Sequence, residues 1–408
     1  MTAQPTHPIH QPALDAIPDE WWDALVVGAG PAGSTAALRL AAQGYRVLIV
    51  DKHRFPRDKV CGDGLIPDAI QSLRRIGLYE RVREIGYQTD RGVVFSPSQI
   101  DVTIPMSFLA IKRMIFDEMI AQEAVTRGAV LCQGQVNDLV IRPDGTITAS
   151  CSASARTIRA RVAVIATGAD VSLLRPLGMV VQPQMSAIAM RCYVRSSFSI
   201  EHPVISFDRS IIPGYAWIFP LRNDEYNVGC GIVYRGPARE QANLKEIFQT
   251  FITAFPLARR LLQDGEALTP LRGARLRWGL AGTRPITDGN VLAIGETIGA
   301  TFPFTGEGIG KAMETGELAA TVIHQAFTEE QFNHLQAFPR RLEDDLRPRY
   351  YGYRVAEDWM AHAWLGDLVA WRARKSQYVR EALTGLIAET VDPRAVFSVR
   401  GMVKSLWM

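Results

Sequence analysis

The feature that most constrains the fold is a strand–turn–helix–strand pattern near the N-terminus. The apolar run 24–27 leads into the turn GAGPAG (28–33), a helical pattern continues to Gly44, and a second apolar run ends at Asp51. A unit of this kind lays two parallel strands side by side with a helix across them, and it begins a parallel sheet. The sequence therefore predicts an α/β fold in this part of the chain.

The same unit has the pattern of a dinucleotide-binding site. The three glycines permit a tight turn, a close approach of the backbone to a pyrophosphate, and close packing of the helix on the strand. The free N–H groups at the helix N-terminus favour a phosphate, and an acid at the end of the second strand can hold a ribose hydroxyl. The residues expected to bind a dinucleotide here are Gly28, Gly30, Ala32, Gly33, Asp51 and Lys52.

The chain has 408 residues, a length typical of two or three domains. Strand-like alternation and Pro turns fill residues 176–275, which predicts a sheet-rich second domain of α+β character. We expect a first domain over 21–80, 108–175 and 276–330, and a second over 81–107 and 176–275. A disordered leader is expected over 1–20 and a helical C-terminal region over 331–408.

Composition excludes several classes of protein. The net charge of +3 gives no reason to expect nucleic acid as a partner. The sequence has no apolar run long enough to span a membrane, and residues 1–20 lack the pattern of a signal peptide. The five cysteines form no CxxC pair and the histidines show no metal-ligand spacing, so we expect a cytoplasmic protein without a metal site.

A second glycine-rich segment lies near residue 300. Gly295 and Glu296 end a predicted strand at 290–296, and PFTGEGI (303–309) opens a helix at Gly306, Gly308 and Ile309. An acid at a strand end followed by a helix N-terminus can hold a ribityl chain and place a helix dipole at a flavin, where it favours the reduced anion.

Together with this segment, FPRDKVCGDGL (55–65), KRMIFD (112–117), ATGA (166–169) and YAWIFP (215–220) give a resemblance to a known family. The chain resembles the geranylgeranyl-reductase branch of the FAD-dependent oxidoreductases, whose relatives include menaquinone reductases, flavin halogenases and aromatic hydroxylases. The resemblance implies a Rossmann-like FAD-binding domain, with NAD(P)H or another reductant as electron donor. It also implies further FAD contacts at Cys61, Gly62, Arg113 and Gly168, and a substrate wall of Tyr215, Trp217, Phe219 and Pro303.

The chain departs from the family pattern at two places. Relatives usually have Gly-Asp where this sequence has Gly295-Glu296, and hydroxylases have Asp-Gly where it has Thr167-Gly168. These changes indicate a divergent member. Cys61 has two interpretations: a thiol that gates the flavin or donates a proton, or a small packed residue, as we expect for the other four cysteines.

The C-terminal region contains Trp359, Trp364 and Trp371, which we place on one side of a single helix. This helix is predicted to be a lid over the FAD domain, and the alternative is an interfacial helix at a membrane that contains a lipid substrate.

The leading hypothesis for function is hydride transfer from reduced FAD to a double bond of an isoprenoid, quinone or lipid substrate. The alternatives are a monooxygenase acting on an aromatic group (a small molecule, a carrier-bound group or a peptidyl Trp in quinone cofactor maturation), a halogenase, and a flavin-binding scaffold without activity.

Overall fold

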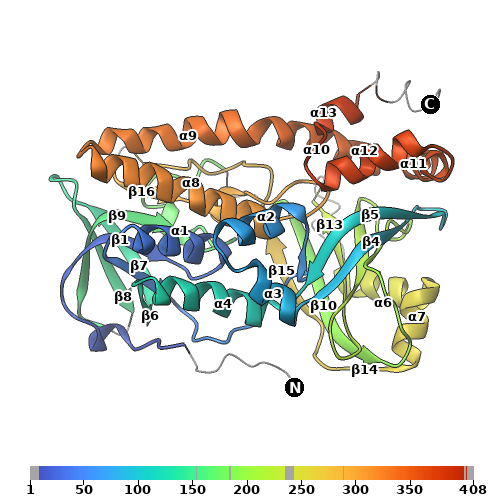
Figure 1. Cartoon of the computed structure of the whole chain (residues 1–408), viewed down its shortest axis with the longest axis horizontal. Coiled ribbons are helices and arrows are strands. Elements are labelled where there is room, and N and C mark those ends of the chain that lie inside the picture. The colour runs from blue at the N-terminus through green and yellow to red at the C-terminus, as the bar shows by residue number, and fades with distance from the viewer. Residues whose placement is uncertain are drawn as a thin grey trace.

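Two β-sheets lie side by side in the computed structural model, with helices packed over both of them (Figure 1). The structure describes residues 9–152, 154–182, 185–234, 243–287, 289–398 and 401. The C-terminal helices extend along one side of the molecule, from above the first sheet to the edge of the second (Figure 1).

The first sheet has the strand order β6-β2-β1-β9-β8-β7, and β16 pairs with β9. Its strands are β1 (Trp21–Val27), β2 (Val47–Asp51), β6 (Val130–Gln133), β7 (Gln135–Ile141), β8 (Ile147–Ser152), β9 (Thr157–Ile165) and β16 (Val291–Ala293). The strands β6, β2, β1, β9 and β16 pair in parallel, whereas β7 and β8 extend the sheet in antiparallel fashion. All residues of β2 are buried, as expected for a central strand of a parallel sheet.

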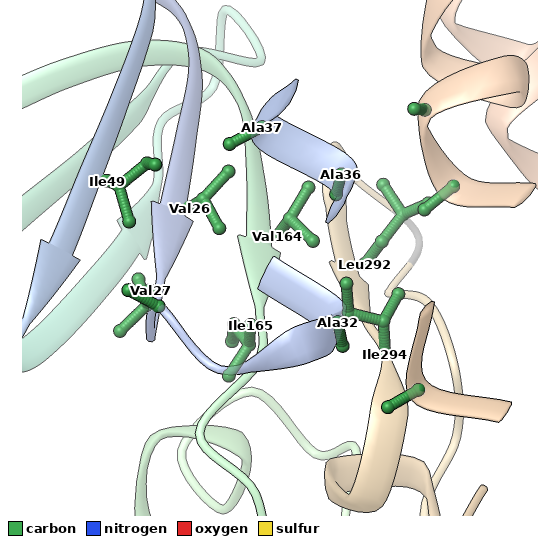
Figure 2. Close-up of a cluster of buried hydrophobic side chains, with 14 of the residues drawn as sticks. Val26, Val27, Ala32, Ala36, Ala37, Ile49, Val164, Ile165, Leu292 and Ile294 are labelled. Atoms are coloured by element: carbon green, nitrogen blue, oxygen red, sulfur yellow. The ribbon is translucent and has the colours of Figure 1, made fainter. Parts of the chain in front are cut away.

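Helices α1 (Pro31–Ala42), α4 (Arg113–Thr126) and α8 (Ile309–Thr328) pack with this sheet. The side chains on the inner face of α1 are small, so the helix packs close to the sheet. Ala32 and Ala36 face Val164 and Leu292 of the sheet (Figure 2). The predicted strand–turn–helix–strand unit is therefore present, and its turn lies at the carboxyl end of β1.

The second sheet has the order β14-β10-β13-β12-β11-β4-β5-β3, and β15 pairs with β10. Its strands are β3 (Gly64–Leu65), β4 (Tyr87–Phe95), β5 (Asp101–Ala110), β10 (Ala187–Ser196), β11 (Val204–Ser206), β12 (Gly214–Pro220), β13 (Glu225–Val233), β14 (Gly265–Ala267) and β15 (Arg272–Leu276). Both β3 and the end of β5 lie in ranges that the sequence assigned to the first domain. The two-domain division itself stays a prediction.

Side chains of β12 divide between the two faces of the second sheet. Ala216 and Ile218 pack into a core with Phe251 and Phe255, which belong to the covering segment of α6 (Leu244–Ala254) and α7 (Pro256–Gln263). Because strand side chains alternate, Tyr215, Trp217 and Phe219 point away from this core.

The remaining helices are α2 (Pro67–Arg75), α3 (Tyr79–Ile85), α9 (Ala337–Arg341), α10 (Arg347–Met360), α11 (Ala363–Lys375), α12 (Gln377–Ile387) and α13 (Pro393–Val396). Of these, α2 and α9 pack against α8, and α11 and α12 pack against β5 of the second sheet. The expectation of one helix containing three tryptophans is wrong. A break at residues 361–362 puts Trp359 on α10, and Trp364 and Trp371 on α11.

The expectation of a disordered leader is wrong for residues 9–20, and residues 1–8 lie outside the described part of the chain. Ile9, Leu14 and Ile17 are buried in the core of the first sheet. The N–H of Gln133, on the edge strand β6, donates to the carbonyl of Pro12 at 2.8 Å. The segment is ordered because its apolar side chains cover this edge of the sheet.

Candidate functional site

A continuous cavity of about 950 Å³ extends from the glycine-rich turn after β1, between the two sheets, to the C-terminal helices. Gly28, Gly30, Asp51 and Arg113 line one end. The loop 57–64, the aromatic residues of β12 and the segment 304–310 line the middle. Apolar side chains of the last helices line the far end.

At the first end, the glycine-rich turn has the geometry of a pyrophosphate cradle. Gly28 has φ +102°, and a Cβ there would lie 2.4 Å from the carbonyl oxygen of Ala166, so the turn itself requires glycine. At Gly30 a Cβ would meet only Arg57 Nη2, at 3.9 Å. Packing within the protein does not explain Gly30, whereas a phosphate in the cavity next to the uncapped N-terminus of α1 does.

Asp51 is fixed beside this turn. Its Oδ2 accepts a hydrogen bond from the N–H of Ala29 and its Oδ1 one from the N–H of His53, both at 2.8 Å. The carboxylate is thereby oriented at the end of β2, where a ribose hydroxyl of a dinucleotide is held. Lys52 also lines the cavity, and it forms an exposed ion pair with Asp170 at 4.0 Å.

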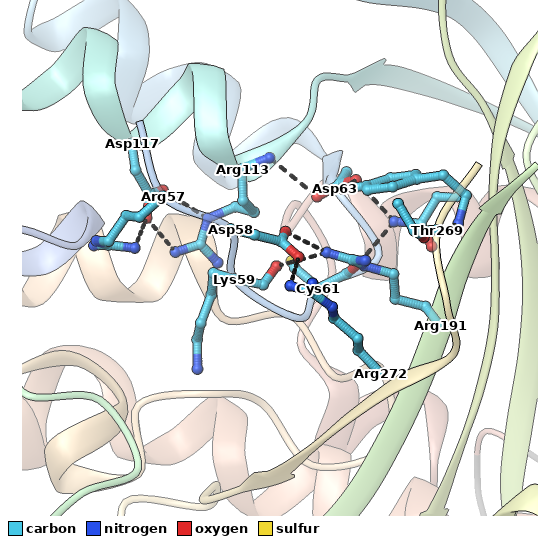
Figure 3. Close-up of polar contacts among 12 residues, drawn as sticks. Arg57, Asp58, Lys59, Cys61, Asp63, Arg113, Asp117, Arg191, Thr269 and Arg272 are labelled. Carbon is cyan, nitrogen blue, oxygen red and sulfur yellow. Dashed lines mark hydrogen bonds and ion pairs between the residues drawn. The ribbon is translucent and has the colours of Figure 1, made fainter. Parts of the chain in front are cut away.

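Two arginines stand next to the turn and are held by acids. Arg113 makes two hydrogen bonds to Asp117, at 2.6 and 2.9 Å, and Arg57 pairs with the same carboxylate at 3.0 Å (Figure 3). Burial alone would lower the pKa of Arg113, but Asp117 and, to a smaller extent, Cys61 raise it above its ordinary value. Both guanidinium groups line the cavity near the expected pyrophosphate.

The loop 57–64 is clamped to the second sheet by charge. Arg191 of β10 is fully buried and donates to Asp58 at 2.5 Å and to the carbonyl of Lys59 at 3.3 Å (Figure 3). Arg272 of β15 reaches the same Asp58 carboxylate at 3.1 Å. If the loop moved away, the buried charge of Arg191 would lose its partner in a medium of low dielectric constant, which is strongly unfavourable. The ion pairs therefore hold the loop in place.

A second polar group fixes the loop at Asp63. Its carboxylate accepts hydrogen bonds from Tyr193 Oη at 2.7 Å, Asn227 Nδ2 at 2.8 Å and the N–H of Arg113 at 3.2 Å. Burial raises the pKa of Asp63 to about 6, although these hydrogen bonds oppose the shift. Asn227 also donates to the carbonyl of Cys61 at 2.7 Å. Cys61 and Gly62 are held facing the cavity as a result.

The three aromatic residues of β12 form a continuous wall. The ring centroids of Tyr215 and Trp217 are 5.9 Å apart, and those of Trp217 and Phe219 are 6.3 Å apart. Trp217 Nε1 donates to Asn227 Oδ1 at 2.9 Å, and Tyr215 Oη donates to the carbonyl of Thr305 at 2.6 Å. The wall therefore spans the distance from the loop 57–64 to the start of α8.

Glu296 also lines the cavity, and two hydrogen-bond or ion-pair contacts hold its carboxylate. Its Oε1 accepts from the N–H of Arg277 at 3.3 Å, and its Oε2 lies 3.7 Å from Lys59 Nζ. Gly168, Gly306, Gly308 and Ile309 line the cavity as well. Gly308 is the N-cap of α8 and offers no side-chain hydrogen bond, so the first N–H groups of α8 are available to a ligand.

Three of the expected site residues do not line the cavity. A Cβ on Gly33 would lie 1.9 Å from the carbonyl oxygen of Gly28, and one on Gly295 would lie 2.8 Å from the Cβ of Ala32, so both serve close packing behind the site. Pro303, expected in the substrate wall, is buried, and the neighbouring Phe304 lines the cavity instead.

The far end of the cavity is predominantly apolar, and sequence reasoning did not find it. Its lining residues from α10, α11 and α12 and from the residue after α13 are Tyr353, Ala356, Glu357, Trp359, Leu365, Val369, Ala370, Leu383, Leu386, Ile387 and Phe397. Nor did the sequence indicate Asp58, Asp63, Arg191 or Asn227, although the PRDKVCGDG segment marked the loop itself as unusual.

The residues present fit FAD. The unfilled space at Gly30 and the uncapped start of α1 suit a pyrophosphate. The fixed carboxylate of Asp51 suits a ribose, and the uncapped start of α8 suits the flavin ring. No group of metal-ligating side chains occurs among the described residues. Within that same part of the chain, no helix combines the length and the apolar character needed to cross a membrane.

Comparison with known proteins identifies the family of the chain. A family model described as an FAD binding domain matches residues 22–333. The chain belongs to this family, and the family resemblance predicted from the motifs is confirmed. The protein is an FAD-dependent oxidoreductase.

Named relatives cover much of the chain. It is 32% identical to menaquinone reductase of Mycolicibacterium smegmatis over 74% of this chain and 76% of the relative. It is 30% identical to conditioned medium factor receptor 1 of Dictyostelium discoideum, over 78% of this chain and 68% of the relative. It is 25% identical to digeranylgeranylglycerophospholipid reductase 3 of Methanosphaera stadtmanae, over 93% and 98%.

Two solved structures share the fold. A geranylgeranyl bacteriochlorophyll reductase-like protein from Thermoplasma acidophilum has a TM-score of 0.72 at 20% identity, over 95% of this chain and 96% of the other. The flavin-dependent brominase Bmp2 has a TM-score of 0.77 at 19% identity, over 95% and 98%. At these identities the likeness shows the fold alone.

Proposed function

We propose that the protein reduces carbon–carbon double bonds of an isoprenoid chain, free or attached to a quinone or lipid. Bound FAD supplies the hydride for this chemistry once NAD(P)H or another reductant has reduced it. Relatives named as menaquinone reductase and digeranylgeranylglycerophospholipid reductase support the substrate class.

The observation on which this proposal rests is the shape and lining of the cavity. It continues past the aromatic wall into a predominantly apolar compartment between β4, β5 and the helices α10–α12. A small phenol would fill only the part next to the wall, whereas a long apolar chain would contact the whole length. Burial of apolar surface contributes about 25 cal/mol per Å², so a chain gains affinity along this compartment.

The residues of the site have two roles in this reaction, holding the substrate and excluding water. Tyr215, Trp217 and Phe219 hold the reacting end of the substrate against one side of the cavity. The clamped loop at Cys61 and Gly62 closes the cavity at the wall, since a Cβ on Gly62 would lie 3.1 Å from the Phe219 ring. Water is thereby kept from the region between the wall and the start of α8.

The test is product formation with and without oxygen. Enzyme loaded with FAD is offered unsaturated isoprenoids and aromatic compounds, with a chemical reductant as electron source. We expect saturated isoprenoid product in air-free samples and no gain from oxygen, which competes with the substrate for electrons. Hydroxylated aromatic product that needs oxygen would favour a monooxygenase, and halogenated product that needs oxygen and halide would favour a halogenase.

We also propose that α11 lies against an anionic membrane surface while substrate enters. Trp364 and Trp371 are 64% and 44% exposed, and Lys375 Nζ lies 4.3 Å from the centre of the Trp371 ring. Leu365 and Val369 of the same helix line the cavity. An aromatic and basic face suits the lipid headgroup region, and here it adjoins the apolar compartment.

Vesicle binding tests this contact. Full-length protein should co-sediment with vesicles containing an anionic phospholipid, and Trp364→Ala with Trp371→Ala should reduce the bound fraction several-fold without changing FAD content. Val140→Ala, an exposed apolar residue on β7, is the control. Equal binding by the double variant and wild type would contradict a membrane role for α11.

A further inference from the structure

Charged side chains gather around the buried Lys311, where α2, α8 and the C-terminal helices meet. This group, which we name the Lys311 cluster, consists of Asp68, Glu307, Lys311, Glu314, Arg349 and Glu389. Lys311 is 1% exposed, and its Nζ lies 2.5 Å from Glu314 Oε2, 2.8 Å from Glu389 Oε1 and 3.9 Å from Asp68 Oδ2. Arg349 forms a further ion pair with Glu389.

Two carboxyl groups of the Lys311 cluster border the cavity, Asp68 and Glu307. Asp68 lies in the first turn of α2. A Cβ added to Gly310 would lie 2.0 and 2.5 Å from the two carboxyl oxygens of Asp68. The Asp68 side chain therefore fills the space beside the first turn of α8. Glu307 directly precedes the N-cap of α8. It lies two residues after Thr305, whose carbonyl accepts the hydrogen bond from Tyr215. Glu307 therefore lies between the aromatic wall and the start of α8.

The Lys311 cluster has more acid than base. Lys311 and Arg349 face four carboxyl groups, so full ionisation would leave an excess of negative charge in a buried place. Among the described residues, neither Glu307 Oε1 nor Asp68 Oδ2 accepts a hydrogen bond, although both atoms are buried. The other oxygen of each group does accept one, Glu307 Oε2 from Thr305 Oγ1 at 3.4 Å and Asp68 Oδ1 from the N–H of Ala69 at 2.6 Å. A buried carboxylate with one oxygen left without a hydrogen bond is costly, and protonation lowers that cost.

The pKa values agree with this geometry. Burial raises the pKa of Asp68 to about 7; Lys311 opposes the shift, and Glu389 and Glu314 add to it. Burial, together with Asp68 and Glu389, raises the pKa of Glu307 well above its ordinary value. The other titratable groups that face Glu307 and Asp68 are the tyrosines Tyr215, Tyr350 and Tyr353, and Glu357 lines the same cavity.

We propose that Glu307 is the acid that protonates the substrate in the reduction, and that Asp68 is a positioning residue that restores the proton to Glu307. This inference rests on the proposed reduction of a double bond. The Glu307 O–H bond breaks and a C–H bond forms at the carbon that does not receive the hydride. The electron pair for the other C–H bond comes with the hydride from reduced FAD, and Glu307 is left as a carboxylate until Asp68 passes it a proton. Asp68, which lines the cavity, regains its proton from water that enters when the product leaves.

The test compares Glu307→Gln, Asp68→Asn and Glu314→Gln. Glutamine keeps the shape of Glu307 without the acidic proton. Glu314 also contacts Lys311, but it is 37% exposed and does not line the cavity, so Glu314→Gln controls for the loss of one charge. Each variant is first checked for FAD content and melting temperature, which we expect to remain close to those of wild type.

The kinetic measurement is anaerobic reoxidation of the reduced, FAD-loaded enzyme by an unsaturated isoprenoid. Glu307→Gln should slow it roughly 100- to 10,000-fold, the range for loss of a general acid, while Glu314→Gln stays within a few-fold of wild type. An acid must be protonated to act, so the wild-type rate should fall as pH rises through the pKa of Glu307. Asp68→Asn removes a neighbouring negative charge and should move this fall to lower pH.

A measurement without turnover completes the test. At neutral pH, infrared spectra of the resting enzyme should contain the C=O stretch of a protonated carboxyl group that is missing in Glu307→Gln. Wild-type rate and pH profile in an FAD-replete Glu307→Gln, or an unchanged infrared spectrum, would overturn the assignment. If no isoprenoid reoxidises the wild type, the proposed function fails, and the infrared comparison still decides whether Glu307 holds a proton.

Discussion

Replacing Gly30 by alanine should separate FAD binding from folding. Gly30 has φ −77°, which alanine adopts without strain, and its added Cβ would meet no protein atom closer than Arg57 Nη2 at 3.9 Å. Alanine is a poorer helix N-cap than glycine, which lowers the free energy of unfolding. Alanine also lowers the entropy of the unfolded chain, which raises the free energy of unfolding. Each effect is about 0.5–1 kcal/mol, so the two nearly cancel. The apo-protein should therefore melt within a few degrees of wild type.

FAD affinity should fall, because the new methyl group enters the space where the pyrophosphate approaches the backbone. Overfilling a fitted site costs about 1–3 kcal/mol, which is roughly a 5- to 150-fold rise in Kd. The assay is titration of apo-protein with FAD by quenching of flavin fluorescence, beside a thermal melt. Gly33→Ala is the contrast: its Cβ would collide with the Gly28 carbonyl at 1.9 Å, so stability and FAD content should fall together. Wild-type FAD affinity in Gly30→Ala would refute the cradle.

Three further substitutions test the middle of the cavity. Trp217→Phe keeps an aromatic ring but leaves the buried Asn227 Oδ1 without its donor, so the free energy of unfolding should fall by about 1–3 kcal/mol; an unchanged melting curve would count against the network. Cys61→Ala should cost on the order of 1 kcal/mol and leave turnover within a few-fold; a hundredfold loss at full FAD content would make the thiol catalytic. The pKa of Asp63 is about 6 in the folded protein against an ordinary 3.8, so its stabilising contribution is complete below 3.8 and is lost as pH rises through 6. Wild type should accordingly lose stability relative to Asp63→Asn across that interval, as denaturant unfolding below pH 3.8 and above pH 6 would show.

The cofactor end of the site was predictable because its geometry is local. Gly28, Gly30 and Asp51 lie within one strand–turn–helix–strand unit, and the spacing of the residues alone determines which of them meet. Gly33 belongs to the same pattern, but its role is packing, which only the distance to Gly28 shows. The start of α8 was predictable for the same reason, as a strand end followed by a glycine-rich helix start.

The polar network under the aromatic wall was not predictable. Asn227 and Asp63 are 164 positions apart in the chain, and nothing in either segment indicates that they meet. The break between α10 and α11 was missed because residues 361–362 are Ala and His, neither of which marks a helix end. The packed segment 9–17 was missed because its Pro-rich and Gln-rich composition conceals three well-spaced apolar residues, Ile9, Leu14 and Ile17.

The most direct test of the proposed reaction is a single turnover without oxygen. FAD-loaded enzyme is photoreduced, mixed with an unsaturated isoprenoid, and followed by flavin absorbance, and the product is then identified by mass spectrometry. The account predicts that the flavin reoxidises as the substrate concentration is raised and that one double bond becomes saturated for each FAD. A flavin that stays reduced until oxygen is admitted, and then yields hydroxylated product, would contradict it.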